Sequence, residues 1–412
     1  MKGLKSDMWW IAGICILLIA GVIVVQWVQH GEKDLQEKIP YDLVTTFKGD
    51  GRTSRAFTWF TNDPDVEGIV QIAQGTEANA LEDTASLIST YQVTSSEITN
   101  SNGKDKAVHK AEVTGLQPGH TYVYRVGSGR SEEWSEAYTF TTEKDNDNHF
   151  TFINVTDSQG VTEADFGLWG KTLNQAFSVF PDAKFIVHNG DLTEEPDNEA
   201  AWSFFMNKAQ GRLAQVPLMP VTGNHDEVDK NADAYMRHFN LPVNGDEGSI
   251  PGTNYSFDYG HVHFVILNTE SNIKGQLNWL ANDLESSNQQ WTIVAMHRPA
   301  YGGNTYDKVE KWVKVFDEYG VDLVLQGHNH EYSRSYPLRD GVIVNESEGT
   351  VYVTTNTAGQ KFNEKKEDQF YHAVHFQNYK QMFAGITANG NKLVYEAYDV
   401  DGEKLDEFVL TK

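Results

Sequence analysis

Five apolar runs between residues 150 and 330 end on side chains that can bind a metal ion or move a proton. One of them, Phe185-Ile186-Val187, leads through His188, Asn189 and Gly190 to Asp191. The other four end in the same way, before Asp157, before Asn224-His225-Asp226, before His297 and before His328-Asn329-His330. Short apolar runs predict buried strands, and α/β folds place their chemistry at the carboxyl ends of strands. We therefore expect carboxylates, an amide and several imidazoles to meet at one rim.

The ligand types indicate which metals this rim could bind. Carboxylate, amide and imidazole groups without thiolate favour zinc, manganese or iron. The chain has one cysteine, Cys15, so a multi-thiolate site and an intramolecular disulfide are both excluded. An aspartate can bridge two ions about 3.5–4 Å apart, and Asp191 is the candidate. Such a pair lowers the pKa of bridging water and neutralises phosphoryl oxygens, which predicts a dinuclear centre for phosphoryl chemistry.

The elements that must position these residues alternate between strand and helix from Phe150 onward. Apolar residues recur at helical spacing in 163–180, 276–284 and 309–319, and 254–267 has the pattern of a hairpin. Turn dipeptides at 389–390 and 401–402 predict a β-meander over 383–410. Asp399, Asp401 and Glu403 also allow a calcium loop, but the expected glutamate at the twelfth position is missing, which favours a turn. Helices between strands indicate an α/β layered fold.

Residues 41–144 have a different pattern, with short alternating strands separated by Gly, Asn, Ser and Asp. Strands are predicted at 55–61, 68–73, 110–113, 121–126 and 137–140, which indicates an all-β sandwich. The stretch 116–124 resembles the turn-and-tyrosine signature of a fibronectin type III domain, with Trp59 in the place of its core tryptophan. Because no polar residues converge in this module, we expect it to act as a spacer or a positioning element.

The first part of the chain predicts a membrane anchor. Residues 8–28 are apolar apart from Gln26, which is the length of about 20 residues that a bilayer span needs, and tryptophans flank them. The C-terminal end of this stretch lacks the small residues of a signal-peptide cleavage site, which favours an uncleaved single-pass anchor. Its length and its flanks favour an anchor over a buried core helix. Two lysines lie on each flank, so the flanking charge does not decide the orientation of the anchor. The short N-terminal side favours the orientation in which the body lies outside the cell. The predicted domains are 1–38 (anchor and stalk), 39–146 (fibronectin-like) and 147–412 (catalytic).

Charge limits the class of partner. The formal net charge of the chain is -25, and the charges of residues 1–38 sum to zero, so the whole excess lies on residues 39–412. An acidic body without basic runs repels nucleic-acid phosphates, which excludes DNA or RNA as the main partner. The expected partners are a small phosphorylated substrate and, through residues 8–28, the cell membrane; the sequence does not determine the oligomeric state.

In order and spacing, the five polar blocks resemble those of the calcineurin-like metallophosphoesterase superfamily over residues 150–335. The fibronectin-like module, together with 297–299 and 330–334, is similar to the purple acid phosphatase branch. The resemblance implies a four-layer α/β/β/α sandwich. It also implies a metal-dependent hydrolase that cleaves phosphomonoesters or phosphodiesters by attack of a metal-bridged hydroxide.

The resemblance assigns roles to individual residues. Two metals would be held by six side chains: Asp157, Asp191 and His330 at the first metal, and Asp191, Asn224, His297 and His328 at the second. His225 would contact the phosphoryl group and protonate the leaving oxygen, and Asp226 would orient His225. Arg298 either engages the phosphate or only packs its loop.

Two positions depart from the pattern of the family. Purple enzymes carry a tyrosine three residues after the bridging aspartate, and here that residue is Glu194. Relatives outside the purple branch often place a histidine two residues after the first aspartate, and here Gln159 stands there. Gln159 is either a weak amide ligand or a residue that orients bound water. We therefore expect no purple colour, and manganese or zinc in preference to ferric iron.

The sequence leaves several alternatives open. His188 either supports the metal aspartate or packs in the core, and His372 and His375 could approach the substrate. The fold could also be kept as a cell-surface binding module without turnover, although the nearly complete ligand set favours hydrolysis. Whether the substrate is a monoester, a cyclic nucleotide or another diester depends on the loops around Tyr301 and Asn304 and on 360–380.

Overall fold

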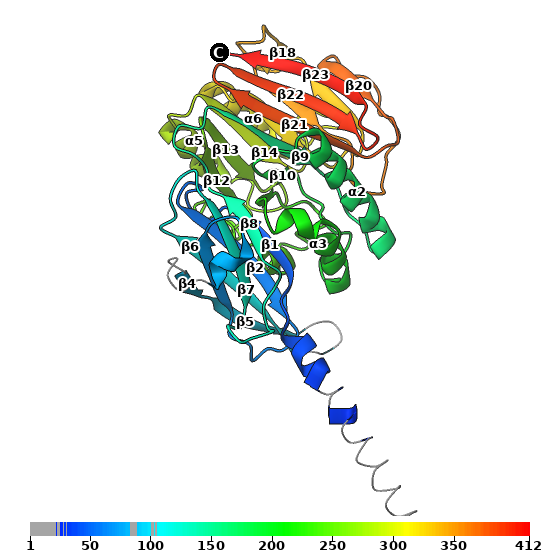
Figure 1. The fold of residues 1–412 in the computed structure, drawn as a ribbon. Helices are drawn as coiled ribbons and strands as arrows, with labels where there is room; N and C mark the ends of the chain where they lie inside the picture. Colours follow the sequence, from blue (N-terminus) through cyan, green and yellow to red (C-terminus); the bar gives the residue numbers. More distant parts are fainter. Residues whose placement is uncertain are drawn as a thin grey trace, which may run out of the picture.

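The computed structural model describes residues 22, 25–27, 29, 31–82, 89–99, 103 and 105–412. The predicted anchor, residues 8–28, lies almost entirely outside this part of the chain. Of the helices that are described, none combines the length and the apolar character needed to cross a bilayer. Residues 31–38 are helical and lead into the first strand. Figure 1 shows the β-rich N-terminal module below the larger α/β domain.

The N-terminal module is a β-sandwich of two four-stranded sheets. The first has the order β1 (Tyr41–Thr46), β2 (Ser54–Thr61), β6 (Asp105–Thr114), β5 (Thr94–Thr99). The second has the order β4 (Ser89–Gln92), β3 (Ile69–Gln74), β7 (Thr121–Gly127), β8 (Tyr138–Thr141), and the short 3-10 helix η1 (Ala78–Leu81) follows β3. Trp59 and Tyr124 are both fully buried in its core. The Tyr122 hydroxyl accepts the backbone N–H of Gln117 at 2.8 Å, the corner bond that closes such sandwiches.

The larger domain contains two sheets. The six-stranded sheet has the order β11 (Leu218–Pro220), β10 (Ile186–His188), β9 (His149–Val155), β21 (Met382–Asn389), β22 (Lys392–Asp399), β23 (Lys404–Thr411). The seven-stranded sheet has the order β12 (Tyr255–Tyr259), β13 (Val262–Leu267), β14 (Trp291–Met296), β15 (Leu323–Gln326), β19 (Val351–Thr354), β16 (Tyr332–Ser335), β20 (His372–Phe376). A small hairpin, β17 (Leu338–Arg339) and β18 (Val342–Ile343), lies apart from them.

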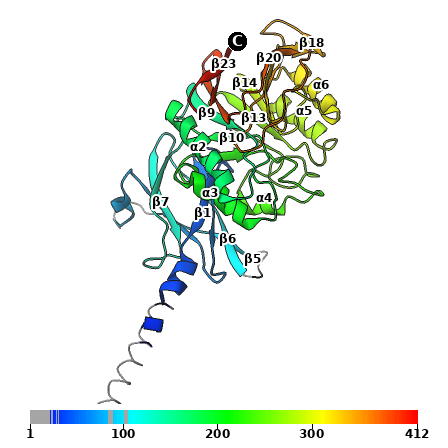
Figure 2. The same ribbon diagram turned by 90° about the vertical axis from the view of Figure 1, so that its right-hand side faces the viewer.

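The larger domain also contains helices, which lie between its strands in the sequence. They are α2 (Glu163–Val179), α3 (Glu199–Leu213), α4 (Asp233–His238), α5 (Gln276–Ser286), the 3-10 helix η2 (Asp307–Val309) and α6 (Glu310–Tyr319). Between the sheets, Phe152 of β9 meets Phe264 of β13 edge-on at 5.2 Å. α2 packs on α3 and β21, whereas α5 and α6 cover a second core on β13, β14 and β15 (Figures 1 and 2). The predicted α/β class with an N-terminal β-sandwich is confirmed.

The N-terminal module is fixed to α3, the helix that follows the Asp191 loop. Strand β1 runs along α3, as Figure 2 shows. Thr45 donates its hydroxyl to the Leu213 carbonyl at 3.0 Å, and Lys106 pairs with Glu199 at 2.6 Å. Phe47, just after β1, belongs to the core of the larger domain. These contacts favour the predicted positioning role of the module.

The predicted elements differ from the observed ones at α3 and agree with them at the acidic stretch 399–403. α3 has no counterpart among the predictions because its polar residues, Asn207 and Gln210 among them, and Gly211 interrupt an apolar period. The carboxylate of Asp399 accepts the N–H groups of Asp401 and Glu403 and pairs with Lys380 at 2.8 Å, so this acidic stretch forms the predicted turn.

Candidate dinuclear metal centre

The loops after five strands meet where the two sheets face each other. Asp157, Asp191 and Asn224 follow β9, β10 and β11 of the six-stranded sheet, while His297 and His328 follow β14 and β15 of the seven-stranded sheet. The sequence predicted that these residues meet at a single rim. In the structure they lie on two rims, one from each sheet, that face each other. Both rims are carboxyl ends of parallel strands, which explains why they converge.

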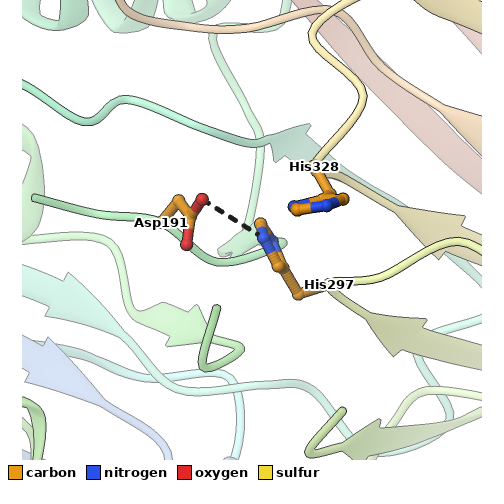
Figure 3. A group of neighbouring side chains, drawn as sticks. All are labelled: Asp191, His297 and His328. Atoms are coloured by element: carbon orange, nitrogen blue, oxygen red, sulfur yellow. Dashed lines mark ion pairs between the residues drawn. The ribbon is translucent and has the colours of Figure 1, made fainter. Parts of the chain in front are cut away.

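The predicted ligands form two groups that share one residue. The first group is Asp157, Asp191 and His330, and the second is Asp191, His297 and His328; within each group the ligand atoms lie within 4.8 Å of one another. Asp191 belongs to both groups, as a bridging residue must. Figure 3 shows the imidazole of His297 between the Asp191 carboxylate and the His328 ring.

Four of these residues have a left-handed backbone. The φ angles are +52° at Asp157, +54° at Asp191, +72° at His328 and +48° at His330. Such angles cost a non-glycine residue about 1–3 kcal/mol and persist where the surroundings enforce them, most often at functional sites. The sharp turns explain how residues next to strand ends point their side chains at a common centre.

The first group is organised around Asp157, which is fully buried. One carboxylate oxygen lies 3.0 Å from Nε2 of His330, and the other accepts the Thr156 hydroxyl at 2.5 Å and the His328 N–H at 2.9 Å. Burial acts to raise the pKa of Asp157, but His330 outweighs it and holds this pKa well below its usual range. Nδ1 of His330 is buried and has no hydrogen-bond partner among the described residues.

The second group is organised around His297. Its Nδ1–H donates to the Asn189 carbonyl at 2.8 Å, which fixes the ring so that Nε2 faces Asp191 at 3.2 Å and the Asn224 amide oxygen at 3.3 Å. Burial lowers the pKa of His297, but Asp191 outweighs burial and raises it to about 10. The group therefore stabilises a positive charge at this point.

The spacing of these atoms fits a bound cation. Tetrahedral ligands at the usual bond length of about 2.0–2.1 Å lie about 3.3 Å from one another. The distances from imidazole nitrogen to oxygen, 3.0 Å at Asp157 and 3.2 and 3.3 Å at His297, lie close to this value. Burial lowers the pKa of His328 to about 4, so this ring is neutral and available as a ligand.

Arg298 lies beside the second group. Its Nε donates to both carboxylate oxygens of Glu270, at 2.9 and 3.0 Å, and its guanidinium lies over the Tyr306 ring. Nη1 is 3.2 Å from Nε2 of His328. Arg298 thus packs its loop and at the same time places its charge next to a predicted ligand, so the two roles that the sequence left open do not exclude each other.

The predicted role of Asp226 is wrong in one respect. We expected it to orient His225, but its carboxylate accepts three backbone N–H groups instead: Asp191 at 2.7 Å, Gly223 at 2.8 Å and Leu192 at 3.0 Å. The partner of the His225 ring is the Glu194 carbonyl, which Nδ1 contacts at 2.7 Å. Because its carboxylate caps the N–H groups of Asp191 and Leu192, Asp226 shapes the Asp191 loop.

Gln159 and Glu194, the two departures from the family pattern, contact each other. Nε2 of Gln159 donates to Glu194 at 3.1 Å, and the buried Oε1 of Gln159 has no hydrogen-bond partner within the described chain. The same Glu194 oxygen pairs with Lys361. Burial acts to raise the pKa of Glu194, but Lys361 and Gln159 outweigh it and lower this pKa. Sequence patterns did not point to Lys361.

His188, His372 and His375, whose roles the sequence left open, all contact other protein groups. His188 contacts the Ser158 hydroxyl at 2.9 Å and packs against Trp169, so it supports the Asp157 loop from the core. Asp368, His372 and His375 form a third group whose possible ligand atoms lie close together. Both nitrogens of His372 are already hydrogen-bonded, to the Gln369 N–H and the Gly302 carbonyl, so we do not assign a metal to this group.

Comparison with known families agrees with this fold and site. Residues 146–332 match the family model of the calcineurin-like phosphoesterases, and residues 40–142 match that of the purple acid phosphatase N-terminal domain. The chain thus carries a calcineurin-like phosphoesterase domain, preceded by a domain of the purple acid phosphatase N-terminal type. The predicted resemblance is confirmed.

Individual relatives agree with the assignment to this family. The chain is 28% identical over 294 residues to acid phosphatase type 7 of Mus musculus, covering 61% of this chain and 64% of that protein. It is 26% identical to purple acid phosphatase 15 of Arabidopsis thaliana, covering 62% and 54%. The match thus spans less than two thirds of these relatives. The structure of purple acid phosphatase PPD1 from yellow lupin shares the fold with a TM-score of 0.76 at 18% identity, covering 91% of this chain and 74% of that one.

Proposed function

We propose that this protein is a dinuclear-metal phosphoesterase that hydrolyses phosphomonoesters or phosphodiesters of small molecules. The observation that supports this most directly is that two ligand groups share Asp191. Two metal sites joined by one carboxylate are the arrangement that phosphoryl transfer by a metal pair requires.

Each metal would be held by residues already close to one another. Asp157, Asp191 and His330 would hold the first ion, and Asp191, Asn224, His297 and His328 the second. When bound, the ions would activate water and neutralise the phosphoryl oxygens. Glu194 is bound to Lys361 and Gln159. The first site therefore lacks the anionic ligand that a tyrosinate at this position would supply. This favours manganese or zinc over ferric iron.

His225 would act as the acid toward the leaving oxygen. Its Nδ1 must carry hydrogen because its partner is the Glu194 carbonyl, so Nε2 is the nitrogen that can take up and release a proton. The backbone N–H of His225 donates to the Asp191 carboxylate at 2.9 Å, which holds the proposed acid close to the bridging residue. Gln159, two residues after Asp157, would bind the first ion weakly or orient water through its free Oε1. Arg298 would add positive charge for the phosphate.

The remaining proposals concern location. Residues 8–28 would anchor the chain in the cell membrane, residues 32–38 would form the stalk, and the domains 39–146 and 147–412 would lie outside the cell. A protease-protection assay on intact cells tests the orientation, because an inward-facing body would be protected.

The test of function is a substrate panel with the full-length protein in detergent, loaded with manganese, zinc or iron. We expect hydrolysis of a monoester or a diester by wild type, and at least a hundredfold loss in Asp191→Asn. A metal-loaded protein that hydrolyses nothing on the panel would reject the proposal and favour a binding module.

A further inference from the structure

A short segment, residues 357–363, crosses the first ligand group; we call it the strap. At its start, the Thr357 hydroxyl donates to the Asp157 carbonyl at 2.5 Å. Gly359 lies so close to the same loop that a Cβ there would be 2.7 Å from the Ser158 carbonyl oxygen and 3.0 Å from that of Asp157. Any larger residue at position 359 would push the strap away, so the start of the strap is fixed against Asp157.

The other end of the strap is fixed against His330. The Asn363 N–H donates to the His330 carbonyl at 3.3 Å, and its side-chain amide donates to the Asn329 carbonyl at 2.7 Å. Gln377 joins the two segments, because its amide donates to the carbonyls of His330 and Asn363 at 2.7 and 2.6 Å. Residues between 359 and 363 must therefore pass beside the Asp157–His330 pair.

Lys361 is at the middle of the strap. Its ammonium group pairs with Glu194, and its side chain is 39% exposed, so it is accessible to a ligand. The carbonyl of that same Glu194 holds the ring of His225. The positive charge of Lys361 is therefore held next to the proposed acid and beside the first metal group.

The second metal group has a matching cation. Arg298 stands beside His328 and is held by Glu270, as Lys361 is held by Glu194. Each half of the site thus has one cation whose position a glutamate fixes. A lysine has three donor hydrogens, so Lys361 can keep its contact with Glu194 and still donate to a ligand.

We propose that Lys361 binds the phosphoryl oxygens of the substrate and that Glu194 positions it for this contact. This inference rests on the proposed function, since it names a residue that recognises the phosphoryl group at that same site. The contact favours the more negative phosphoryl group, so it binds a phosphomonoester more strongly than a phosphodiester.

The test measures binding of inorganic phosphate to the metal-loaded, full-length protein by calorimetry, beside kinetics with an aryl monoester and an aryl diester. Lys361→Ala and Lys361→Gln should weaken phosphate binding about 10- to 100-fold, the usual effect of losing a hydrogen bond to a charged group. Lys361→Arg keeps the charge and should retain most of the affinity. Metal content should equal that of wild type in all three.

Lys365→Ala is the matched control, because Lys365 lies four residues further on and pairs with the exposed Asp368. The control should bind phosphate like wild type, and the Lys361 variants should lose more activity on the monoester than on the diester. Unchanged phosphate affinity in Lys361→Ala, or an equal loss in Lys365→Ala, would overturn the inference. If wild type hydrolysed neither ester but Lys361→Ala still lost phosphate binding, the proposed function would fail and the Lys361 contact would stand.

Discussion

Asp226 accepts the backbone N–H of Asp191 at 2.7 Å, so a carboxylate that was expected to serve the acid His225 instead fixes the loop of the bridging ligand. We predict that Asp226→Asn destabilises the fold by about 1–3 kcal/mol, because an amide cannot accept all three N–H bonds and leaves buried donors unpaired. Metal content and thermal unfolding check this. Asp229→Asn, an exposed neighbour, should change neither. If the pH–rate profile of Asp226→Asn shifted while its metal content stayed normal, Asp226 would instead have the predicted role of orienting His225.

For His225, we expect that replacement by alanine lowers kcat by about 10²–10⁴-fold, the usual contribution of a positioned acid. Because the predicted ligands are other residues, the bound metal should be unchanged. An ester with an acidic leaving group such as nitrophenol needs less protonation, so the loss should be smaller for it than for an alkyl ester. Equal losses on both esters would contradict the assignment of His225 as the acid.

The visible absorption of the iron-loaded protein tests whether Glu194 takes the place of the tyrosine of the purple branch. A protein loaded with iron should show no strong visible charge-transfer band, because Glu194 stands where the purple branch has its tyrosine and is bound to Lys361. Absorption spectroscopy of wild type and of Glu194→Tyr makes the comparison. A strong band in wild type would require another tyrosine at the metal and would overturn the proposed ligand set.

A pH-dependent contribution to stability is expected from His263. Its ring contacts Asp258 at 2.7 Å and Asp283 at 2.9 Å; burial opposes the charged form, but the two carboxylates outweigh it and raise the pKa of His263 to about 9. A raised folded-state pKa contributes stability that is complete below about pH 6.5 and is lost as the pH rises through 9. The loss should be on the order of 3 kcal/mol.

Denaturant unfolding of wild type and His263→Gln between pH 6 and 10 checks this. The pH-dependent difference between the two proteins should shrink to near zero by pH 10. A difference that is constant across this range would show that His263 contributes packing alone.

Part of the candidate site could be read from the sequence because the information is local. Asp157, Asp191 and His297 each follow an apolar run, and a strand end needs no distant contact to be recognised. The long periodic helices, such as α2 and α6, were predicted for the same reason. α3 was not, since its burial against β1 of the other module, rather than its own pattern, stabilises it.

The sequence by itself determined the types of ligand, their order along the chain and the family to which they belong, because these depend on residues adjacent to each other. Only the tertiary structure decided that Asp226 caps the Asp191 loop, that Glu194 holds both Lys361 and the ring of His225, and that the strap runs from Asp157 to His330. These contacts join residues up to 200 positions apart, as Thr357 and Asp157 are. Packing of the two sheets brings such residues together, and no spacing in the sequence encodes it.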